Sequence, residues 1–453
     1  MEFTDLSFLY LWLPPLLAVY FLVRSMAAKN AVLLAFSLLF YATGRPLHLA
    51  LLVGLSWVNF FLAKRIRHGF PITVWLPVAL NIGVLAAFKY LPGASLPMGI
   101  SFYTFSMIAY LADVYLKRTA AEQKFSSLLL YLTMFPKLLQ GPIVRYRDVA
   151  PQLTQRTTSP QAAFEGGLRF AAGLAKKVLL ADYCGSVIAE LAGIEGNFCF
   201  LGAWLTGILF AFRLYFDFSG YSDMAIGLGK IFGFTYRENF NLPYAASSVS
   251  DFWRRWHISL GSFFRDYVYI PLGGSRVGWH RQVINLLVVW VLTGVWHGSG
   301  WNYVLWGLYF FAALTAERKF RDRLDGLPLW SRRVITLAVV FFGWVIFANE
   351  DLGTLGHTLI SLLGFHGFSA PGVAVKLVNS LPLMAVCVLG CTALPRLVVT
   401  YWYFLCRMDR DEGNALLRGL YLASAFILMA GLLALCTVSL VGNTSAPSIY
   451  GGF

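Results

Sequence analysis

The chain has 453 residues, of which 58% are hydrophobic and only 13% are charged. Soluble domains carry about 25% charged residues, so the composition excludes an ordinary soluble domain and indicates a membrane protein. The formal net charge is +14, which in a soluble protein would suggest nucleic-acid binding. Here the lysines and arginines gather between apolar segments, as topology determinants and lipid-headgroup contacts do. We therefore expect the lipid bilayer, and no nucleic acid, as their partner.

Helices are the default element for crossing a bilayer, because each backbone polar group must find a partner inside the lipid. Several apolar segments approach the about 20 residues that cross the hydrocarbon core. No β-barrel alternation is present in the sequence. The chain is therefore predicted to be an all-α polytopic membrane protein.

The N-terminal part contains four apolar segments separated by short cationic ones. The expected spans are residues 7–23, 31–43, 47–63 and 71–88. Arg24 and Lys29 follow the first span, and the cations of residues 64–67 follow the third. The positive-inside rule places both groups of cations in the cytoplasm and the N-terminus outside.

The regular pattern of spans stops after the fourth. Residues 96–115 are apolar but contain Pro97, Gly99 and Asp113, so we expect a broken or re-entrant helix that faces an interior cavity. Residues 135–148 contain Pro-Lys and Gly-Pro elements that forbid a clean span, and their cations suit a cytoplasmic interface.

The next two segments differ in character. Residues 151–159 are polar and are the best loop candidate in the first half of the chain. Residues 165–180 are amphipathic and contain Arg169, Lys176 and Lys177, so we expect them near the membrane interface.

A further span is expected at residues 200–216, where Arg213 interrupts it, and it runs into residues 217–234. That second segment contains glycine and serine breaks together with Asp217 and Asp223. These carboxylates could orient a histidine, but ion pairing inside the bundle, for example with Arg213, is the favoured role.

The C-terminal part contains a basic segment, residues 318–323, which is expected in the cytoplasm. Further spans are expected at residues 334–348, 377–394 and 417–440. The polar tail 443–453 is then expected outside. The six cysteines show no metal or disulfide spacing and are expected to be buried neutral thiols.

Residues 251–306 carry the densest set of candidate functional groups, including half of the 14 tryptophans. His257 and His297 lie in this stretch, while a third histidine, His280, belongs to a basic turn and is expected to be solvated. Ionisable groups at membrane depth are costly, so they indicate a functional site.

His297 lies in the apolar run 282–311, which as one helix would be about 45 Å long and would exceed the bilayer core. The Gly-Ser-Gly sequence directly after His297 predicts a break there, with the histidine near mid-membrane. A core histidine bonded to a backbone carbonyl is the alternative, but the break and the flanking Trp296 and Trp301 favour function.

No second ligand at metal spacing accompanies His297, so we expect no metal, and the Gly-x-Ser-x-Gly nucleophile motif is absent. A general base remains, which would activate a hydroxyl or thiol for attack on an acyl carbonyl. Burial favours the neutral imidazole, which is the form that a base needs.

The pattern of residues 253–264 fits an amphipathic helix. Four residues at a 4-3-4 spacing share one face of it: Trp253, His257, Leu260 and Phe264. His257 would point into a cavity, while Arg254 and Arg255 would hold phosphate or a carrier protein. The alternative is an interfacial helix whose tryptophan and arginines contact lipid headgroups.

Five stretches together resemble the membrane-bound O-acyltransferase (MBOAT) family, in the bacterial branch of alginate O-acetyltransferase and D-alanyl transfer proteins. They are residues 96–115, 135–146, 217–234, 239–274 and 292–306, in the family's order. FWRRWHISL followed by FRDYVYIPLGG, and TGVWHG, are the most specific motifs. The alginate-type branch is the nearer match, through QGPIVRY and NFNLPYAASSVSDFWRRWHISL. The first and last spans match only as generic apolar helices.

The resemblance implies an MBOAT fold of about 10–13 transmembrane or re-entrant helices around a central cavity reached from both sides. One membrane domain would fill the chain, with N-terminal spans (1–90), a catalytic core (91–320) and C-terminal spans (321–453). His297 would be the catalytic histidine and His257 the second active-site residue. Five further residues are candidates to contact substrate or donor: Trp253, Arg254, Arg255, Trp296 and Asp217.

The resemblance also implies an acyltransferase of the bacterial inner membrane. It would relay acetyl groups from a cytoplasmic donor, acetyl-CoA or an acyl-carrier thioester, for O-acetylation of an exported polysaccharide such as alginate. No cofactor is expected to be bound. The expected partners are an extracytoplasmic acetyltransferase and a polysaccharide synthase or export machinery.

Two alternatives are D-alanyl or other acyl transfer to cell-envelope polymers, and a non-enzymatic transporter or export channel. Broken helices and intramembrane charge suit transporters as well. However, no pair of matching discontinuous segments recurs in two halves of the sequence.

Overall fold

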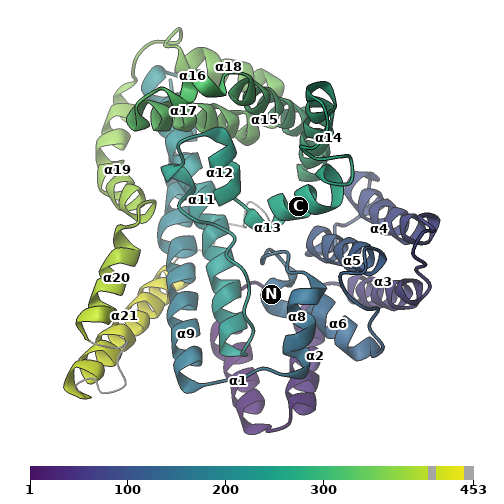
Figure 1. Cartoon of the computed structure of the whole chain (residues 1–453). Coiled ribbons are helices and arrows are strands. Elements are labelled where there is room, and N and C mark those ends of the chain that lie inside the picture. Colours follow the sequence, from purple (N-terminus) through teal and green to yellow (C-terminus); the bar gives the residue numbers. More distant parts are fainter. Residues whose placement is uncertain (407–414, 443–453) are drawn as a thin grey trace.

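The computed structural model describes residues 1–406 and 415–442, and every regular element within these residues is a helix (Figure 1). The all-α prediction is therefore confirmed. Six of the described helices are long and apolar enough to cross a membrane. They are α3 (Pro46–Lys64), α4 (Ile72–Tyr90), α11 (Phe200–Ile231), α17 (Leu329–Ala348), α19 (Pro371–Gly390) and α21 (Ala415–Gly442).

The four expected N-terminal spans are confirmed as helices. A π-helical segment, η1 (Phe8–Trp12), continues into α1 (Leu13–Leu22), and α2 (Met26–Ala42) follows before α3 and α4. Ser25 caps α2, because its side chain accepts a hydrogen bond from a backbone N–H of the first turn. Helix α3 begins at Pro46. Proline suits this position, because a backbone N–H there would have no partner within the helix and proline has no N–H.

The break expected within residues 96–115 is wrong, because α5 (Ile100–Tyr115) is continuous and nearly all of its residues are buried. Pro97 and Gly99 both precede its first turn. Gly99 has a φ of +69°, and a Cβ there would lie 2.3 Å from the carbonyl oxygen of Leu138. The helix breakers therefore permit a close backbone approach at the start of the helix.

Residues 135–148 form no span, as expected. Helix α6 (Phe125–Thr133) and the short α7 (Phe135–Leu138) precede an irregular segment, and α8 (Tyr146–Thr154) follows it. The loop expected at residues 151–159 is partly wrong, since α8 covers its first half. The helix continues through its internal proline, which removes one backbone hydrogen-bond donor.

Two cations expected at the cytoplasmic interface are buried in protein, and their position relative to the membrane stays a prediction. Arg145 forms an ion pair with Asp266, which belongs to the π-helical segment η4 (Arg265–Tyr269). The Lys137 ammonium lies 4.3 Å from the ring centroid of Tyr131. A carboxylate and an aromatic face thus replace the solvent that the sequence pattern implied.

The position of residues 165–180 near the membrane interface stays a prediction, but the segment packs inside the helix bundle. Helix α9 (Pro160–Ala175) and the π-helical segment η2 (Lys176–Ala181) pack against α11 in the centre of the bundle (Figure 1). Helix α10 (Asp182–Ala192) follows and packs against the same helix. The polar face of the segment therefore meets protein rather than lipid headgroups.

The breaks expected within residues 217–234 are wrong, because α11 is continuous to Ile231. Two of its glycines, Gly220 and Gly227, meet glycines of α9 instead. A Cβ on Gly220 would lie 2.7 Å from the carbonyl oxygen of Gly173, and a Cβ on Gly227 would lie 2.6 Å from that of Gly166. Small residues allow two membrane helices to approach this closely.

Asp217 and Asp223 form ion pairs inside the bundle, as expected, but with lysines of η2 rather than with Arg213. Lys177 Nζ lies 2.7 Å from Asp217 Oδ1, and Lys176 Nζ lies 2.6 Å from Asp223 Oδ2. The cations assigned to the membrane surface therefore compensate carboxylates of α11.

The three expected C-terminal spans are confirmed as α17, α19 and α21. Two shorter helices, α18 (Leu352–Leu362) and α20 (Leu394–Leu405), were not predicted. The expectation for the tail 443–453 falls outside the described residues. All six cysteines are buried, as expected.

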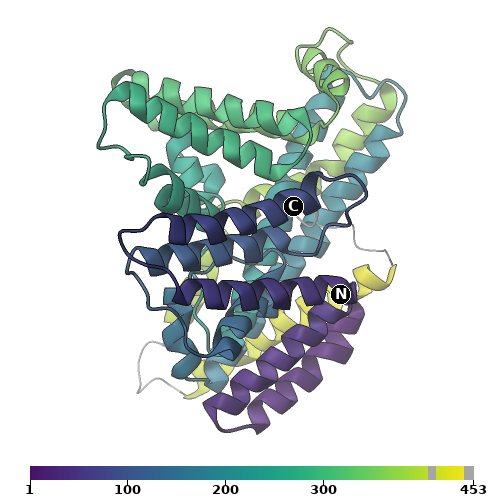
Figure 2. The same cartoon turned by 90° about the vertical axis from the view of Figure 1, so that its right-hand side faces the viewer.

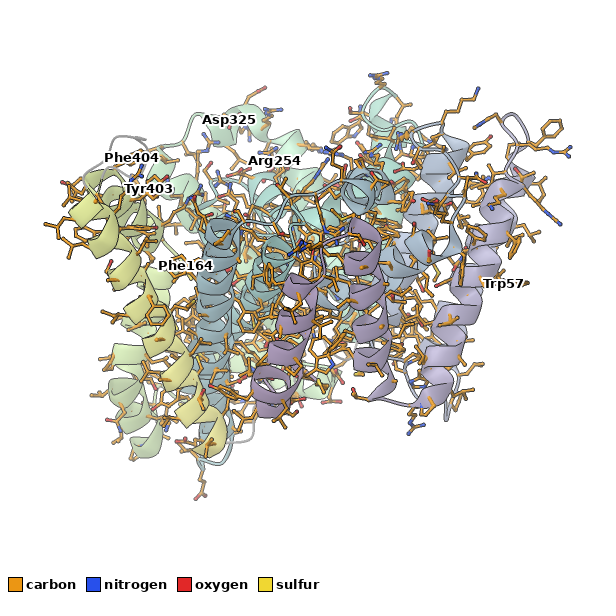
Figure 3. All side chains as sticks on the ribbon, turned by 90° about the horizontal axis from the view of Figure 1, so that it is seen from below. Trp57, Phe164, Arg254, Asp325, Tyr403 and Phe404 are labelled. Atoms are coloured by element: carbon orange, nitrogen blue, oxygen red, sulfur yellow. The ribbon has the colours of Figure 1, made fainter. Side chains whose placement is uncertain are left out.

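The helices share one main hydrophobic core, which extends from Phe3 to Cys436. The outer surface is also rich in apolar side chains. Trp57 of α3, for example, is 54% exposed and points away from the neighbouring helices in Figure 3. A surface of this kind suits contact with lipid, so the chain is a multi-pass membrane protein.

Candidate active site

The single helix expected over residues 253–264 is wrong, because α12 (Val249–Arg255) and α13 (Ile258–Phe264) are separate. Between them His257 has a φ of +44°, in the left-handed region that residues other than glycine rarely adopt. The two helices therefore point in different directions in Figure 1. No glycine or proline lies at this break, so the sequence pattern did not predict it.

Asn239 holds this break in place. Its side-chain oxygen accepts hydrogen bonds from the backbone N–H and the hydroxyl of Ser259, at 3.1 Å and 2.9 Å, and lies 3.3 Å from Nδ1 of His257. Its side-chain amide donates to the Ser222 hydroxyl of α11 at 3.1 Å. Sequence analysis did not single out Asn239, and its place at the start of the family-like stretch 239–274 was the one available signal.

His297 is the last residue of α14 (Trp279–His297), and α15 (Trp301–Lys319) begins after the Gly-Ser-Gly turn, so the predicted break is confirmed. The two helices form a hairpin and lie side by side in Figure 2. A Cβ on Gly294 would lie 2.5 Å from the carbonyl oxygen of Tyr303 across this hairpin. The depth of His297 in the bilayer stays a prediction.

Aromatic side chains surround the imidazole of His297, which is only 3% exposed. Its ring centroid lies 5.0 Å from that of Trp306 and 5.2 Å from that of Phe347, and both rings are nearly perpendicular to it. Trp296 contacts both histidines, with its ring 4.5 Å from that of His297 and 6.4 Å from that of His257. Such packing restricts the orientations that the imidazole can adopt.

His257 and His297 line one cavity of about 300 Å³, which we call the histidine cavity. Its wall includes all four residues predicted to share a helix face: Trp253, His257, Leu260 and Phe264. They meet in one cavity even though they come from α12, from α13 and, for His257, from the turn between these helices. Trp290 of α14 and Trp306 of α15 also line it, so most of its surface is apolar.

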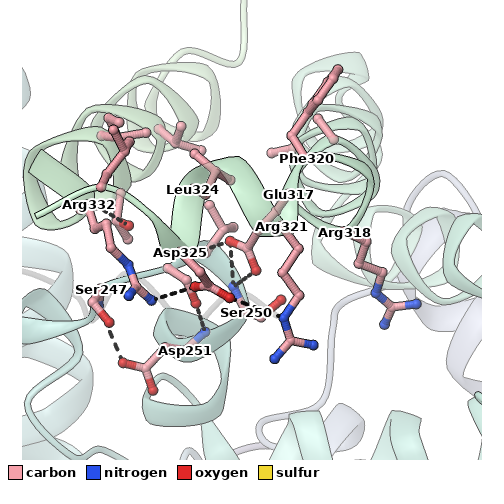
Figure 4. Close-up of a pocket in the computed structure, with 18 of the residues that line it drawn as sticks. Ser247, Ser250, Asp251, Glu317, Arg318, Phe320, Arg321, Leu324, Asp325 and Arg332 are labelled. Atoms are coloured by element: carbon pink, nitrogen blue, oxygen red, sulfur yellow. Dashed lines mark hydrogen bonds and ion pairs between the residues drawn. The ribbon is translucent and has the colours of Figure 1, made fainter. Parts of the chain in front are cut away.

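A second, larger cavity of about 1030 Å³ is rich in arginine, and we call it the arginine cavity (Figure 4). Five arginines line it: Arg254, Arg318, Arg321, Arg323 and Arg332. Three carboxylates line it as well: Asp251, Glu317 and Asp325. The short helix α16 (Arg321–Asp325) forms part of its wall. Arg318 lines both cavities, so the two are neighbours.

The two candidate arginines of α12 occupy different positions. Both form ion pairs with Asp251, Arg254 at 3.5 Å and Arg255 at 3.0 Å. The Arg254 side chain is 71% exposed and lines the arginine cavity, whereas that of Arg255 is 33% exposed and lines neither cavity. Burial opposes ionisation of Asp251, but the hydrogen bond and charge of Arg255 outweigh it and hold the pKa of this carboxyl below its ordinary value. In Figure 3, Arg254 and Asp325 lie at the same edge of the bundle.

Residues 61–350 match the family model described as MBOAT, membrane-bound O-acyltransferase family. The match covers more than half of the chain and contains both cavities. The chain belongs to the MBOAT family.

Relatives of this MBOAT chain carry names that agree with the family. It is 36% identical to the "Probable alginate O-acetylase AlgI" of Azotobacter vinelandii, over 81% of this chain and 78% of the relative. It is 33% identical to the "Peptidoglycan O-acetyltransferase" of Helicobacter pylori, over 80% of each chain. It is 29% identical to the "Teichoic acid D-alanyltransferase" of Bacillus subtilis, over 56% of this chain and 69% of the relative. The MBOAT chain is therefore a membrane acyltransferase, and the transporter alternative is set aside.

The MBOAT structure brings together some of the predicted site residues and not others. Trp253, His257 and His297 line the histidine cavity. Trp296 packs against both histidine rings. Asp217 lines neither cavity and takes part in the ion pair on α11. Within residues 1–406 and 415–442, no group of three or more His, Cys, Asp or Glu side chains is arranged to hold a metal.

Glu317 is a further residue that sequence analysis missed in this MBOAT chain. From α15 its carboxylate accepts hydrogen bonds from the backbone N–H groups of Val249 and Ser250, at 2.5 Å and 3.2 Å. These N–H groups belong to the first turn of α12, where negative charge is favourable. Glu317 thereby fixes α12, which carries residues of both cavities, to the hairpin that carries His297.

Proposed function

We propose that this MBOAT enzyme relays an acetyl group from a cytoplasmic thioester across the bacterial inner membrane, for O-acetylation of an exported polysaccharide such as alginate. The observation that carries the proposal is the histidine cavity, where two buried histidines share one small, mainly apolar space. The relatives named for O-acetylation align with 81% and 80% of the chain, whereas the D-alanyl relative aligns with 56%. This difference supports acetyl transfer over D-alanyl transfer.

His297 acts as the general base in this proposal. Its imidazole takes the proton of an acceptor hydroxyl or thiol, whose oxygen or sulfur attacks the acyl carbonyl carbon. The carbon–sulfur bond of the donor breaks, and the leaving thiolate takes the proton back from the imidazolium. The aromatic rings around His297 hold the imidazole in place and keep water away from the thioester.

His257 is the second active-site residue of the proposal. Because the Asn239 oxygen near its Nδ1 is a hydrogen-bond acceptor, the favoured tautomer carries its proton on Nδ1. The lone pair then lies on Nε2, which can accept a hydrogen bond from the attacking hydroxyl or thiol. His257 thereby orients the acceptor while His297 removes its proton.

The donor in this proposal is acetyl-CoA or an acetylated carrier protein, both of which bring phosphate to the membrane surface. A guanidinium binds phosphate in a planar, two-pronged manner, so the arginine cavity suits the phosphate-bearing end of the donor. Arg318 lines both cavities, and the thioester would pass it to reach the histidines. Arg254 belongs to this donor site. Arg255 instead stabilises the first turn of α12 through its ion pair with Asp251.

The exported polysaccharide lies outside the cytoplasm, so the proposal needs partners there. An extracytoplasmic acetyltransferase would take over the acetyl group, and a polysaccharide synthase or export machinery would supply the final acceptor. The relatives named for alginate and peptidoglycan O-acetylation support an extracytoplasmic acceptor of this kind.

Donor choice in membranes tests the proposal. Membranes that contain the enzyme and the cell's own polysaccharide machinery receive labelled acetyl-CoA, acetylated carrier protein or D-alanyl carrier protein in separate reactions. We predict label in the polysaccharide from an acetyl donor only. Label from the D-alanyl donor alone would replace acetyl by D-alanyl transfer, and label from none of them would contradict acyl relay.

A further inference from the structure

The C-terminal end of α4 touches the turn of α14 that ends at His297. Lys89 Nζ donates a hydrogen bond to the backbone carbonyl of Trp296. The Tyr90 hydroxyl donates to the backbone carbonyl of Val295. These partners lie 207 and 205 residues apart in the sequence. A helix of the N-terminal spans therefore holds the last turn before His297.

The last carbonyls of a helix have no partner within the helix. In α14 the problem is sharp, because Gly298 has an extended backbone with a φ of 177° and the helix stops abruptly at His297. Two donors from α4 supply hydrogen bonds to carbonyls that precede this stop. One of them is a cation, which the negative end of a helix dipole favours.

Lys89 also contacts the side chain of the same residue. Its ammonium lies 5.7 Å from the ring centroid of Trp296, and that ring contacts both histidines. Lys89 is thus bound to the backbone and the ring of the residue next to His297. Movement of its ammonium would shift the last turn of α14 and the aromatic contact between the histidines together.

We propose that Lys89 is a positioning residue for acyl transfer, which holds the end of α14 so that His297 stays aligned with His257 across the histidine cavity. The inference rests on the proposed role of His297 as the base. Lys89 binds the backbone carbonyl of Trp296, the residue before His297, so it acts through the position of His297. Tyr90 assists it from the neighbouring carbonyl.

Two variants at one position separate a positioning role from a merely structural one. Lys89→Met keeps the length of the side chain and removes the donor, while Lys89→Arg keeps a cationic donor. We predict that Lys89→Met lowers the turnover number about 10- to 100-fold, the scale expected when a reacting group is misplaced by about 1 Å. The KM for the acetyl donor should change less than twofold, because the arginine cavity is untouched. Lys89→Arg should restore at least half of the lost turnover.

Lys64→Met is the matched control, since Lys64 lies in the last turn of α3 as Lys89 lies in the last turn of α4. The Lys64 ammonium lies 4.0 Å from the ring centroid of Phe60. It should transfer acetyl groups at the wild-type rate. All rates are compared at equal amounts of protein in the membrane. If Lys89→Met does not insert, Tyr90→Phe provides the smaller change, and it should lower turnover about threefold to tenfold with an unchanged KM.

The outcomes distinguish this inference from the proposed function. Wild-type turnover in Lys89→Met or, where that protein fails to insert, in Tyr90→Phe would overturn the inference, provided that His297→Ala is inactive in the same assay. A KM that rises in proportion to the loss of turnover would also overturn it, because that result indicates donor binding. Activity retained by His297→Ala would instead overturn the proposed function itself.

Discussion

His257 has a backbone conformation that few residues other than glycine adopt, and Asn239 stabilises it. Asn239→Ala would leave the backbone N–H of half-buried Ser259 without its acceptor, a loss that costs about 1–3 kcal/mol. We therefore predict a lower unfolding temperature in detergent and at least tenfold slower acyl transfer. Asn197→Ala, in a partly exposed turn, is the control and should affect neither quantity. Unchanged stability and activity in Asn239→Ala would show that His257 needs no such support.

Arg254 and Arg255 are adjacent in sequence but should respond differently to substitution. Arg254→Gln removes a guanidinium from the arginine cavity, so we predict a higher KM for the donor and recovery of the rate at high donor concentration. Arg255→Gln releases its ion pair with Asp251, so we predict less protein in the membrane and an unchanged KM. Lower membrane abundance of Arg254→Gln with an unchanged KM would indicate that Arg254 contacts lipid headgroups. Wild-type abundance and KM in both variants would contradict the roles assigned to both arginines.

At the scale of single residues, the sequence predicted both histidines and their tryptophan neighbours, because costly or bulky groups in an apolar run stand out. The residues that support them do not stand out. Asn239 and Glu317 are ordinary polar residues, and the sequence around Lys89 is typical of a cation near the end of a span. Their importance comes from partners that lie far away in the sequence, which no local pattern contains.

At the scale of helices, glycine ends one helix and allows close packing in the middle of another. The Gly-Ser-Gly sequence after His297 ends α14, as predicted. Gly220 and Gly227 of α11 do not end that helix. Glycines of α9 face them, and the two backbones pack closely there. The spacing of glycines in one segment cannot separate these cases, since the second depends on the neighbouring helix.

The close packing of α9 and α11 can be tested with single methyl groups. A Cβ on Gly173 would lie 2.6 Å from the carbonyl oxygen of Gly220, so Gly173→Ala must push the helices apart. Overpacking of this kind costs about 1–3 kcal/mol, and we predict a lower unfolding temperature in detergent. Gly54→Ala in α3 is the matched control, because nothing lies within 4 Å of its added methyl group. An equal effect of both substitutions would contradict the packing argument.

At the scale of the whole molecule, the sequence predicted a helical membrane protein and most of its long helices. It missed how the parts meet, since α4 from the N-terminal spans contacts the end of α14 and α15 contacts the start of α12. Membrane helices are apolar on most of their surface. The hydrophobic pattern of such a helix therefore predicts its length more clearly than it predicts which helices pack against it.

The arrangement of cations across the membrane remains a prediction at this scale. Lys64, Arg321 and the cations after the first span should all face the cytoplasm, with both termini outside. Single cysteines at positions 64 and 321, in a chain whose six native cysteines are replaced, can be labelled with a reagent that does not cross membranes. We expect labelling only after the cells are opened, and labelling of either position in intact cells would refute this topology.

The most direct test of the whole account is acyl transfer by His297→Ala. The wild-type enzyme, His297→Ala and His280→Ala are compared at equal membrane abundance with labelled acetyl donor and the cell's polysaccharide machinery. His280 is exposed and lines neither cavity, so it is the matched control. Loss of a general base typically costs about 10²–10⁴-fold in rate, and we predict a loss of this size in His297→Ala and wild-type transfer in His280→Ala. Near-normal transfer by His297→Ala would contradict the assignment of the histidine cavity as the active site.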